Sequence, residues 1–450
     1  MKTIRYPAKA DWKEFLARPV FETKSLERHV QNILNFVKKD GDEAVRHFTK
    51  ALDKAEIEDF LVSEDEFAEA EKNVSGELKN AIQIAKANIE KFHRAQSETP
   101  EIIETTTGVF CWRKSVPIEK VGLYIPAGSA PLFSTVLMLV VPAKIAGCRE
   151  IILCSPPNAS GKINDAILYT AKLCGATKVF KIGGVQAIGA MAFGTETVPR
   201  CFKIFGPGNQ FVTSAKQLVA QYGTAIDMPA GPSEVAVLAD ETCAPSFVAA
   251  DLLSQAEHGV DSQVLLVSTS ETVISETNLE LDKQLAKLSR REIAAKSLEN
   301  SKAILATSLD EAVEILNEYA AEHLIIATEN AEEVAERITN AGSVFIGNYS
   351  CESAGDYASG TNHTLPTNGF AKAFSGVSLD SFVKKITFQK LTANGILNLG
   401  KSVELMAEAE GLDAHKNAIS IRLKNLATEE TEQMEKEKSA ANYTSSANKN

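Results

Sequence analysis

Short apolar runs alternate with helix-like stretches through much of the chain. The runs lie at residues 121–125, 151–154, 178–182, 202–205, 235–238, 264–267, 303–305, 324–326 and 344–346. Signals for helix starts fall between them, for example Ser308-Leu309-Asp310-Glu311. Strands that alternate with helices at this spacing predict parallel β–α units. Because one series of units follows another of similar design, the pattern suggests an internal duplication.

The two ends of the chain differ from this pattern. Residues from about 25 to 96 carry apolar positions at helical spacing (26, 30, 33, 34 and 37), and a second helix is predicted to open with the capping-box pattern Ser63-Glu64-Asp65-Glu66. From about residue 428, Glu, Lys, Ser, Asn and Ala dominate. Such a segment buries too little apolar surface to fold alone, so the tail is predicted to be disordered.

Composition narrows the class of protein. With 450 residues, 44% hydrophobic and 24% charged, the chain resembles a soluble globular protein of two or more domains. Its net charge of −12 argues against a general nucleic-acid binder. The N-terminus lacks the apolar run of a signal peptide, and the longest apolar stretch, 132–146, is too short to span a bilayer. We therefore expect a cytoplasmic protein without a membrane partner, whose seven scattered cysteines are free thiols.

A polar stripe on an apolar helix is the first candidate site. Asp251, Ser254, Gln255 and His258 fall at i, i+3, i+4 and i+7 of a helix predicted to run from Pro245 to about Gly259. A solvated helix face would explain the stripe equally well. However, a glutamine and a histidine three residues apart can also present an oxygen and a nitrogen to one zinc or similar divalent ion.

Glu322 and His323 are the second candidate, lying between a predicted helix and a strand. An adjacent acid and imidazole place two titratable groups at one point, as acid–base catalysis requires. A histidine at a helix C-terminus is the alternative, but it leaves Glu322 unfavourably placed. The pair also sits where a strand begins, whereas open α/β sheets usually bind ligands where strands end. Spacing alone leaves the two interpretations open.

Two further stretches combine acidic residues with histidine. Residues 353–363 are small and polar and include Asp356 and His363; a plain surface loop is possible, but this composition favours a functional loop. In residues 408–416, Gly411 is expected to end one helix and Asp413 to cap the next. His415 would then lie near a helix N-terminus, where the dipole favours the neutral, metal-binding imidazole.

Support for a nucleotide site is weak at this level. The turn 206–211 (GPGNQF) lacks the third glycine of the G-x-G-x-x-G pattern. Gly183-Gly184 and Gly206-Pro207-Gly208 do precede predicted helices, where free amides can bind phosphate. Close packing of helix on strand explains these glycines equally well.

Several longer segments resemble the histidinol dehydrogenase family. They are VGLYIPAGSAPL (121–132), AGPSE (230–234), SQAEHG (254–259), AEHL (321–324) and EAEGLDAHKN (408–417). The similarity extends from near the N-terminus to about Leu426, with the motifs in the family's order. It implies two successive NAD-dependent oxidations in histidine biosynthesis, from L-histidinol through L-histidinal to L-histidine.

The resemblance also implies roles for individual residues. His323 would be the general base of both hydride steps, and Glu322 would activate the water that hydrates the aldehyde. One zinc ion per subunit would be bound by Gln255, His258, Asp356 and His415. NAD would contact Tyr124, Gln186 and Asn209. The substrate would contact these zinc ligands and His323, together with Ser233, His363 and Glu410.

The fold implied by the resemblance is α/β, with two incomplete Rossmann-like parallel-sheet domains and small helical segments at both ends. The expected divisions are an N-terminal extension (1–19), a catalytic domain (20–123 with 234–374), an NAD-binding domain (124–233), a C-terminal dimerisation domain (375–426) and a tail (427–450). The family forms an intertwined homodimer, so Glu410 and His415 would complete the partner's site.

Two other functions remain open from the residues alone. A thiol-dependent aldehyde dehydrogenase would use Cys111 or Cys148 as its nucleophile. A binding protein with two α/β lobes would hold a small molecule without chemistry, although proteins of this type usually carry a signal peptide.

Overall fold

The computed structural model describes residues 1–18, 23–127 and 130–447. Two compact units divide the chain, residues 1–97 with 117–383 and residues 98–116 with 384–450. Gly128 and Ser129, which belong to the family-like segment 121–132, lie outside the described residues. So do residues 19–22, where the expected N-terminal extension meets the catalytic domain.

The first unit contains a five-stranded parallel sheet in the order β6-β5-β4-β7-β8. Its strands are β4 (Lys120–Tyr124), β5 (Glu150–Ser155), β6 (Lys178–Lys181), β7 (Lys203–Phe205) and β8 (Ala225–Ile226). Counted along the chain, the order is third, second, first, fourth, fifth. The chain therefore reverses direction across the sheet between β4 and β7, which is where such sheets usually bind ligands.

A second parallel sheet in the same unit repeats this order. It runs β1-β11-β10-β9-β12-β13. Its strands are β1 (Lys2–Arg5), β9 (Glu234–Ala239), β10 (Gln263–Ser268), β11 (Lys302–Leu305), β12 (His323–Ala327) and β13 (Ser343–Ile346). Without β1 the order is again third, second, first, fourth, fifth. The predicted pair of parallel sheets is confirmed, and the shared topology supports the suggested duplication.

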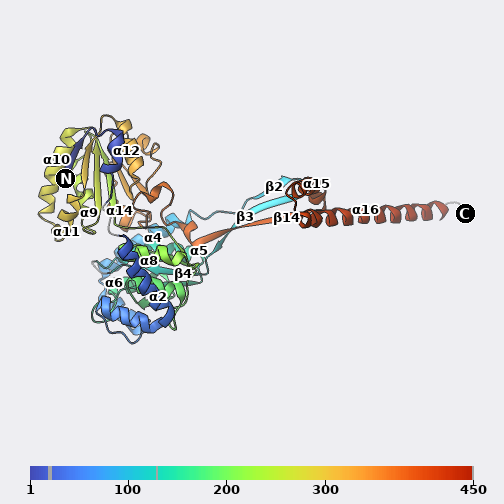
Figure 1. Cartoon of the computed structure of the whole chain (residues 1–450), viewed down its shortest axis with the longest axis horizontal. Coiled ribbons are helices and arrows are strands. Elements are labelled where there is room, and N and C mark those ends of the chain that lie inside the picture. Colours follow the sequence, from blue (N-terminus) through green and yellow to red (C-terminus); the bar gives the residue numbers. More distant parts are fainter. Residues whose placement is uncertain (19–22, 128–129, 448–450) are drawn as a thin grey trace. The chain divides into compact units, whose positions relative to one another are not determined.

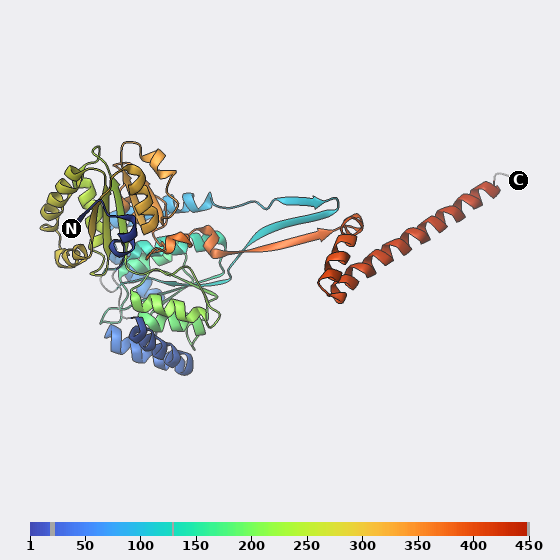
Figure 2. The same ribbon diagram turned by 45° about the horizontal axis from the view of Figure 1, so that its top comes forward.

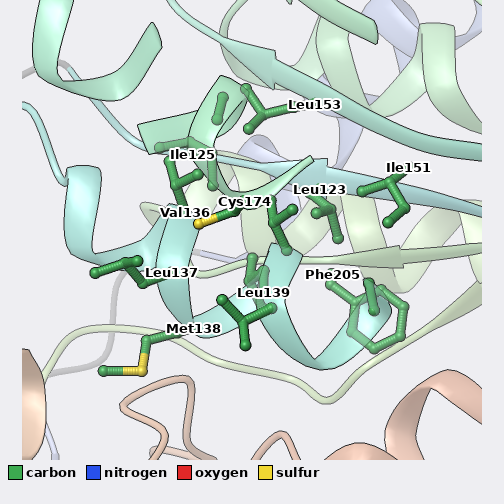
Figure 3. Packing of buried hydrophobic residues seen from close by; sticks show 14 of the residues in the cluster. Leu123, Ile125, Val136, Leu137, Met138, Leu139, Ile151, Leu153, Cys174 and Phe205 are labelled. Atoms are coloured by element: carbon green, nitrogen blue, oxygen red, sulfur yellow. The ribbon is translucent and has the colours of Figure 1, made fainter. Parts of the chain in front are cut away.

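Helices cover both faces of the five-stranded sheet. One face packs on α3 (Glu64–Asn73), α4 (Gly76–Arg94), α5 (Phe133–Ala146) and α6 (Asp165–Cys174). The other packs on α2 (Thr23–Phe48), α7 (Gly184–Phe193) and α8 (Gln210–Ala220). Figure 3 shows Leu123 and Leu153 of the strands gathered with Val136 and Leu139 of α5.

Helix α5 is apolar all round because the sheet and other helices enclose it. Ten of its consecutive residues, Ser134–Ala143, are buried. It covers nearly all of the apolar stretch 132–146 and ends beside Gly147. Neither α5 nor any other helix in the described ranges is both long and apolar enough for a membrane crossing.

The six-stranded sheet also lies between two layers of helices. One layer is α9 (Pro245–Ala256), α10 (Glu271–Leu285) and α11 (Arg291–Glu299). The other is α12 (Leu309–Tyr319) and α13 (Ala331–Ala335), joined by Trp12 of α1 (Trp12–Phe15). Figure 1 shows α10 and α12 on opposite sides of the strands.

The structure differs from the expected domain boundaries in three places. The predicted extension 1–19 contributes β1, which pairs in parallel with β11. Helices α2, α3 and α4 pack on the five-stranded sheet, not on the catalytic sheet with which residues 20–123 were grouped. Residues 98–116 join the second unit. In contrast, the predicted capping box is confirmed, since Ser63 and Glu66 make both of its hydrogen bonds at the start of α3.

The second unit is a three-stranded sheet followed by two helices (Figure 2). The strands are β2 (Ile102–Thr106), β3 (Val109–Pro117) and β14 (Val383–Leu391), with β3 in the middle. Trp112 and Phe388 stack on this sheet with ring centroids 5.5 Å apart. Helices α15 (Ala393–Ala409) and α16 (Asp413–Ala447) follow, and Gly400 packs against Leu423 between them.

The tail differs from its prediction of disorder, because α16 continues through residues 427–447 as a helix. Its side chains are exposed from residue 427 to residue 440, so this part of the helix buries little surface. Glutamate, lysine, alanine, methionine and glutamine favour the helix by local propensity alone. Composition predicted the lack of buried surface correctly, but not the backbone conformation.

Candidate active site

Glu322 and His323 are buried where β12 begins. Helix α12 ends at Tyr319, and Ala320 adopts a left-handed conformation (φ 52°) that turns the chain into the strand. Glu322 and His323 are 7% and 3% exposed, so the surface-helix interpretation is wrong. They lie at the amino end of the sheet, opposite to the usual binding edge.

The contacts of His323 define which nitrogen is free. Its Nδ1 lies 3.2 Å from the carbonyl oxygen of Glu234. A carbonyl can only accept, so Nδ1 carries the hydrogen and donates it. The other nitrogen, Nε2, is buried without a hydrogen bond in the described structure and lies 3.4 Å from Oδ1 of Asp356.

Carboxylates control the charge of this imidazole. Burial alone would lower the pKa of His323, but Glu322, Asp356 and Glu352 outweigh it and raise the pKa to about 10. Burial would raise the pKa of Asp356, but His323 lowers it to about 2. Burial raises the pKa of Glu322 to about 8, although its Oε2 accepts a 2.9 Å hydrogen bond from the backbone N–H of Glu234. In the protein chain alone, His323 and Asp356 therefore form an ion pair.

Gln255 and His258 approach the same point from α9. Gln255 is 1% exposed near the end of the helix. His258 lies beyond the helix, which ends at Ala256, so the predicted helical stripe is wrong in its last position. A backbone hydrogen bond of 3.1 Å from the N–H of His258 to the carbonyl of Gln255 forms a turn, and the imidazole of His258 lies near Glu352 and Asp356.

The loop predicted over residues 353–363 begins as a short helix, α14 (Glu352–Tyr357). Glu352 and Asp356 are four residues apart and share one face of it. Ligand atoms of His258, Glu352 and Asp356 lie within 4.8 Å of one another, which makes this a possible metal site. Oε1 of Gln255 and Oδ1 of Asp356 are buried without hydrogen-bond partners among the described residues, as oxygens awaiting a cation would be.

His363 lies next to this cluster. Its Nδ1 is 2.9 Å from the carbonyl oxygen of Asp356, to which it must donate. Its Nε2 is 3.1 Å from the hydroxyl of Thr135 on α5. Burial lowers the pKa of His363 and favours the neutral ring.

A cleft of about 510 Å³ passes along the first unit beside these residues. Tyr124, Asn209, Ser233 and His258 all line it. Gln186 is buried behind it, where its Nε2 donates to Asp53 at 3.0 Å. One cleft thus joins two of the three predicted NAD contacts to predicted substrate and metal contacts.

The glycine turn beside this cleft has a structural requirement of its own. Gly206 has a φ of 122°, and a Cβ there would collide with the carbonyl of Tyr124. Asp227 accepts a 2.8 Å hydrogen bond from the N–H of Gly206, and the buried Lys216 donates to the carbonyl of Gly206 at 2.7 Å. Lys216 and Asp227 also form a buried ion pair. The sequence did not predict this pair, because a lysine within a helix gives no sign of being buried.

Glu410 and His415 belong to the second unit, at the junction of α15 and α16, and both are exposed. The first unit by itself therefore brings together three of the four predicted zinc ligands: Gln255, His258 and Asp356.

Asp251, the first residue of the predicted stripe, is not part of the cluster's hydrogen bonding in the described structure. Burial raises its pKa to about 7, above the ordinary value of 3.8. The folded state therefore binds this proton more tightly, and the carboxylate destabilises the fold increasingly as the pH rises from about 4 to about 7.

We expect Asp251→Asn to raise the free energy of unfolding by about 2–4 kcal/mol at pH 8 and by little near pH 4. Urea unfolding of both proteins across this range tests it; parallel stability curves would contradict it.

Comparison with known proteins decides the family. The sequence profile of histidinol dehydrogenase matches residues 16–423. The chain belongs to the histidinol dehydrogenase family. Histidinol dehydrogenase of Bacteroides thetaiotaomicron is 61% identical over 426 residues, 95% of this chain and 100% of that one. The Escherichia coli O6:H1 enzyme is 51% identical over 417 residues, 92% and 95% of the two chains.

A crystal structure agrees with this assignment. Histidinol dehydrogenase from Elizabethkingia anophelis is 57% identical and superposes with a TM-score of 0.93, covering 95% of this chain and 99% of that one. As a histidinol dehydrogenase, the chain is an oxidoreductase of histidine biosynthesis. The aldehyde dehydrogenase alternative lacks a suitable thiol: burial raises the pKa of Cys148 to about 12, and Cys111 lies on β3 of the other unit.

Proposed function

We propose that the chain oxidises L-histidinol to L-histidinal and then to L-histidine, using NAD in both steps. The observation that carries this proposal is the buried His323 with its free Nε2 beside the unpartnered oxygens of Gln255 and Asp356. The free nitrogen can accept a proton, and the oxygens can hold a cation that binds the substrate. Alcohol oxidation needs a base that accepts a proton. A bound cation helps to recognise histidinol through its imidazole and its amine.

His323 acts as the base in this scheme. Its Nδ1–H is held by the carbonyl of Glu234, so Nε2 takes the hydroxyl proton while hydride leaves the substrate carbon. A protonated His323 could not do this. Two of the carboxylates that raise its pKa, Asp356 and Glu352, belong to the possible metal cluster, so we expect this pKa to fall in the metal-loaded protein.

Zinc fits the donor set. Gln255, His258 and Asp356 offer one imidazole nitrogen and two oxygens, a combination suited to zinc. When bound, zinc would supply a positive charge that anchors the imidazole and amine of histidinol. His415 would be the fourth protein ligand. Because His415 and Glu410 are exposed in the second unit, we propose that they serve the partner subunit's site in a homodimer.

The cleft suits NAD and substrate together. Tyr124 and Asn209 line it beside the glycine turn, where backbone can approach a phosphate closely, and Gln186 supports this region. Ser233 and His363 would hold the substrate's polar groups, with Glu410 from the partner.

A biosynthetic enzyme that uses the common NAD pool is best placed in the cytoplasm, which we propose as its location.

Glu322→Gln is expected to separate the two steps. Water must lose a proton to attack the aldehyde, and an amide cannot accept it, whereas the first hydride transfer does not need this proton. We expect oxidation of L-histidinal to slow by about 10²-fold and oxidation of L-histidinol by less than about 5-fold. Single-turnover measurements started from each substrate test this. Equal losses in both steps would remove the proposed role of Glu322.

The whole proposal is tested by adding L-histidinol and NAD to the full-length protein. NADH formation that depends on L-histidinol is expected. Failure to reduce NAD would instead favour the binding protein with two α/β lobes.

A further inference from the structure

Glu352 is a buried carboxylate to which the proposed chemistry assigns no role. It is 1% exposed and begins α14, one helical turn before Asp356. Its Oε2 accepts a 3.0 Å hydrogen bond from the hydroxyl of Ser254. Its Oε1 accepts a short hydrogen bond from Nε2 of Gln255. The Ser254 hydroxyl also lies 2.8 Å from the backbone carbonyl of Asp251, so the hydrogen bond from Gln255 is the one that Glu352 does not share.

The second of these hydrogen bonds determines how the amide of Gln255 is turned. An amide has a donating and an accepting end, and exchanging them costs little unless a neighbour distinguishes them. Oε1 of Glu352 accepts this hydrogen bond, so Glu352 selects the NH₂ end of Gln255. The carbonyl end, Oε1, is then left buried and without a partner among the described residues.

The other neighbour of the amide supports the same orientation. Nε2 of Gln255 lies 3.2 Å from Nδ1 of His323, but that nitrogen already donates to the carbonyl of Glu234. Because both nitrogens are donors, this contact does not hold the NH₂ group of Gln255 in place. Glu352 is therefore the acceptor that fixes the NH₂ group here.

We infer that Glu352 is a positioning residue that turns the oxygen of Gln255 toward the metal. It acts through Gln255, since its own oxygens contact polar groups of α9, while Oε1 of Gln255 and Oδ1 of Asp356 have no hydrogen-bond partner among the described residues. Such outer partners orient metal ligands and tune their affinity. The inference rests on the proposed metal site.

Glu352→Gln tests the inference in the full-length dimer. The new amide can present a second NH₂ group to Gln255, so the glutamine turns and its oxygen leaves the metal. We expect Co²⁺ or Zn²⁺ affinity, measured by competition with a chromophoric chelator, to fall by about 10–100-fold. The visible absorption spectrum of the Co²⁺-loaded protein should change as one oxygen ligand is lost.

Exchanging the two partners provides the decisive variant. In Gln255→Glu/Glu352→Gln, the NH₂ of the new glutamine can donate to one oxygen of the new glutamate, and its other oxygen faces the metal. We expect this double variant to recover most of the affinity lost in Glu352→Gln. Rescue of this kind would not follow if Glu352 contributed only packing. A double variant that binds no better than Glu352→Gln would overturn the inference.

Asp251→Asn is the matched control. It replaces another buried carboxylate by an amide, on the same helix α9, without touching a hydrogen bond of the cluster in the described structure. Its metal affinity and Co²⁺ spectrum should match those of the unaltered protein. If the unaltered protein binds no metal, the proposed metal site fails; if it binds metal and Glu352→Gln binds equally well, only the role of Glu352 fails.

Discussion

Replacing His323 by alanine is expected to lower the rate of both oxidation steps by about 10²–10⁴-fold. The physical reason is that Nε2 of His323 is buried beside Asp356 without a hydrogen bond in the described structure, whereas Nε2 of His363 contacts the hydroxyl of Thr135. Both hydride transfers start from a hydroxyl group, on the alcohol first and on the hydrated aldehyde afterwards. Each needs a base at the same place.

Single-turnover rates with L-histidinol and with L-histidinal measure the two steps separately. His323→Asn is the matched variant, because its amide can still donate to the carbonyl of Glu234 but offers no basic nitrogen. We expect it to fold, to bind metal and to be as inactive as His323→Ala. Retention of more than about a tenth of the rate of either step by His323→Asn would show that basicity at this position is not required.

Removal of the metal is the second large effect. We expect the metal-free protein to lose at least about 10²-fold in turnover, because the substrate then loses its anchor and the carboxylates keep His323 protonated. Added Zn²⁺ or Co²⁺ should restore activity. Mg²⁺ should not, because it prefers six oxygen ligands and this site includes an imidazole.

Metal content must be measured alongside activity in this experiment. Full turnover by protein with less than about a tenth of an equivalent of metal would refute the zinc proposal.

Alkylation of thiols distinguishes the zinc proposal from the thiol-dependent alternative. We expect it to leave the metal-loaded activity intact, since Cys148 is buried and its thiol has a raised pKa.

The parallel sheets could be predicted because both are buried on two faces, which gives each strand a continuous apolar run. The strands of the second unit could not. Strand β2 has mostly exposed side chains and β14 alternates irregularly, so neither shows the pattern of a buried strand. The placement of α2 also could not be predicted, because an apolar stripe indicates that a helix packs but not against which sheet.

The candidate site was predictable only in part, for a related reason. Spacing identified Gln255 and the Glu322-His323 pair, but a single sequence does not show that they are buried and meet. It placed His258 on a helix that in fact ends two residues earlier. Glu352 lies just before the stretch 353–363 that was predicted to be a functional loop. Only its hydrogen bonds with Ser254 and Gln255 show that it lies at the site. Which residues meet in the site is determined by long-range contacts that a single sequence does not show. The family resemblance supplied the set of site residues instead.

The number of NADH molecules formed per L-histidinol tests the central claim most directly. Limiting L-histidinol is incubated to completion with excess NAD and full-length protein, and NADH is measured by absorbance while the imidazole products are separated. The two-step scheme predicts about two NADH per L-histidinol, with L-histidine as the product. One NADH per L-histidinol with free aldehyde accumulating would contradict it.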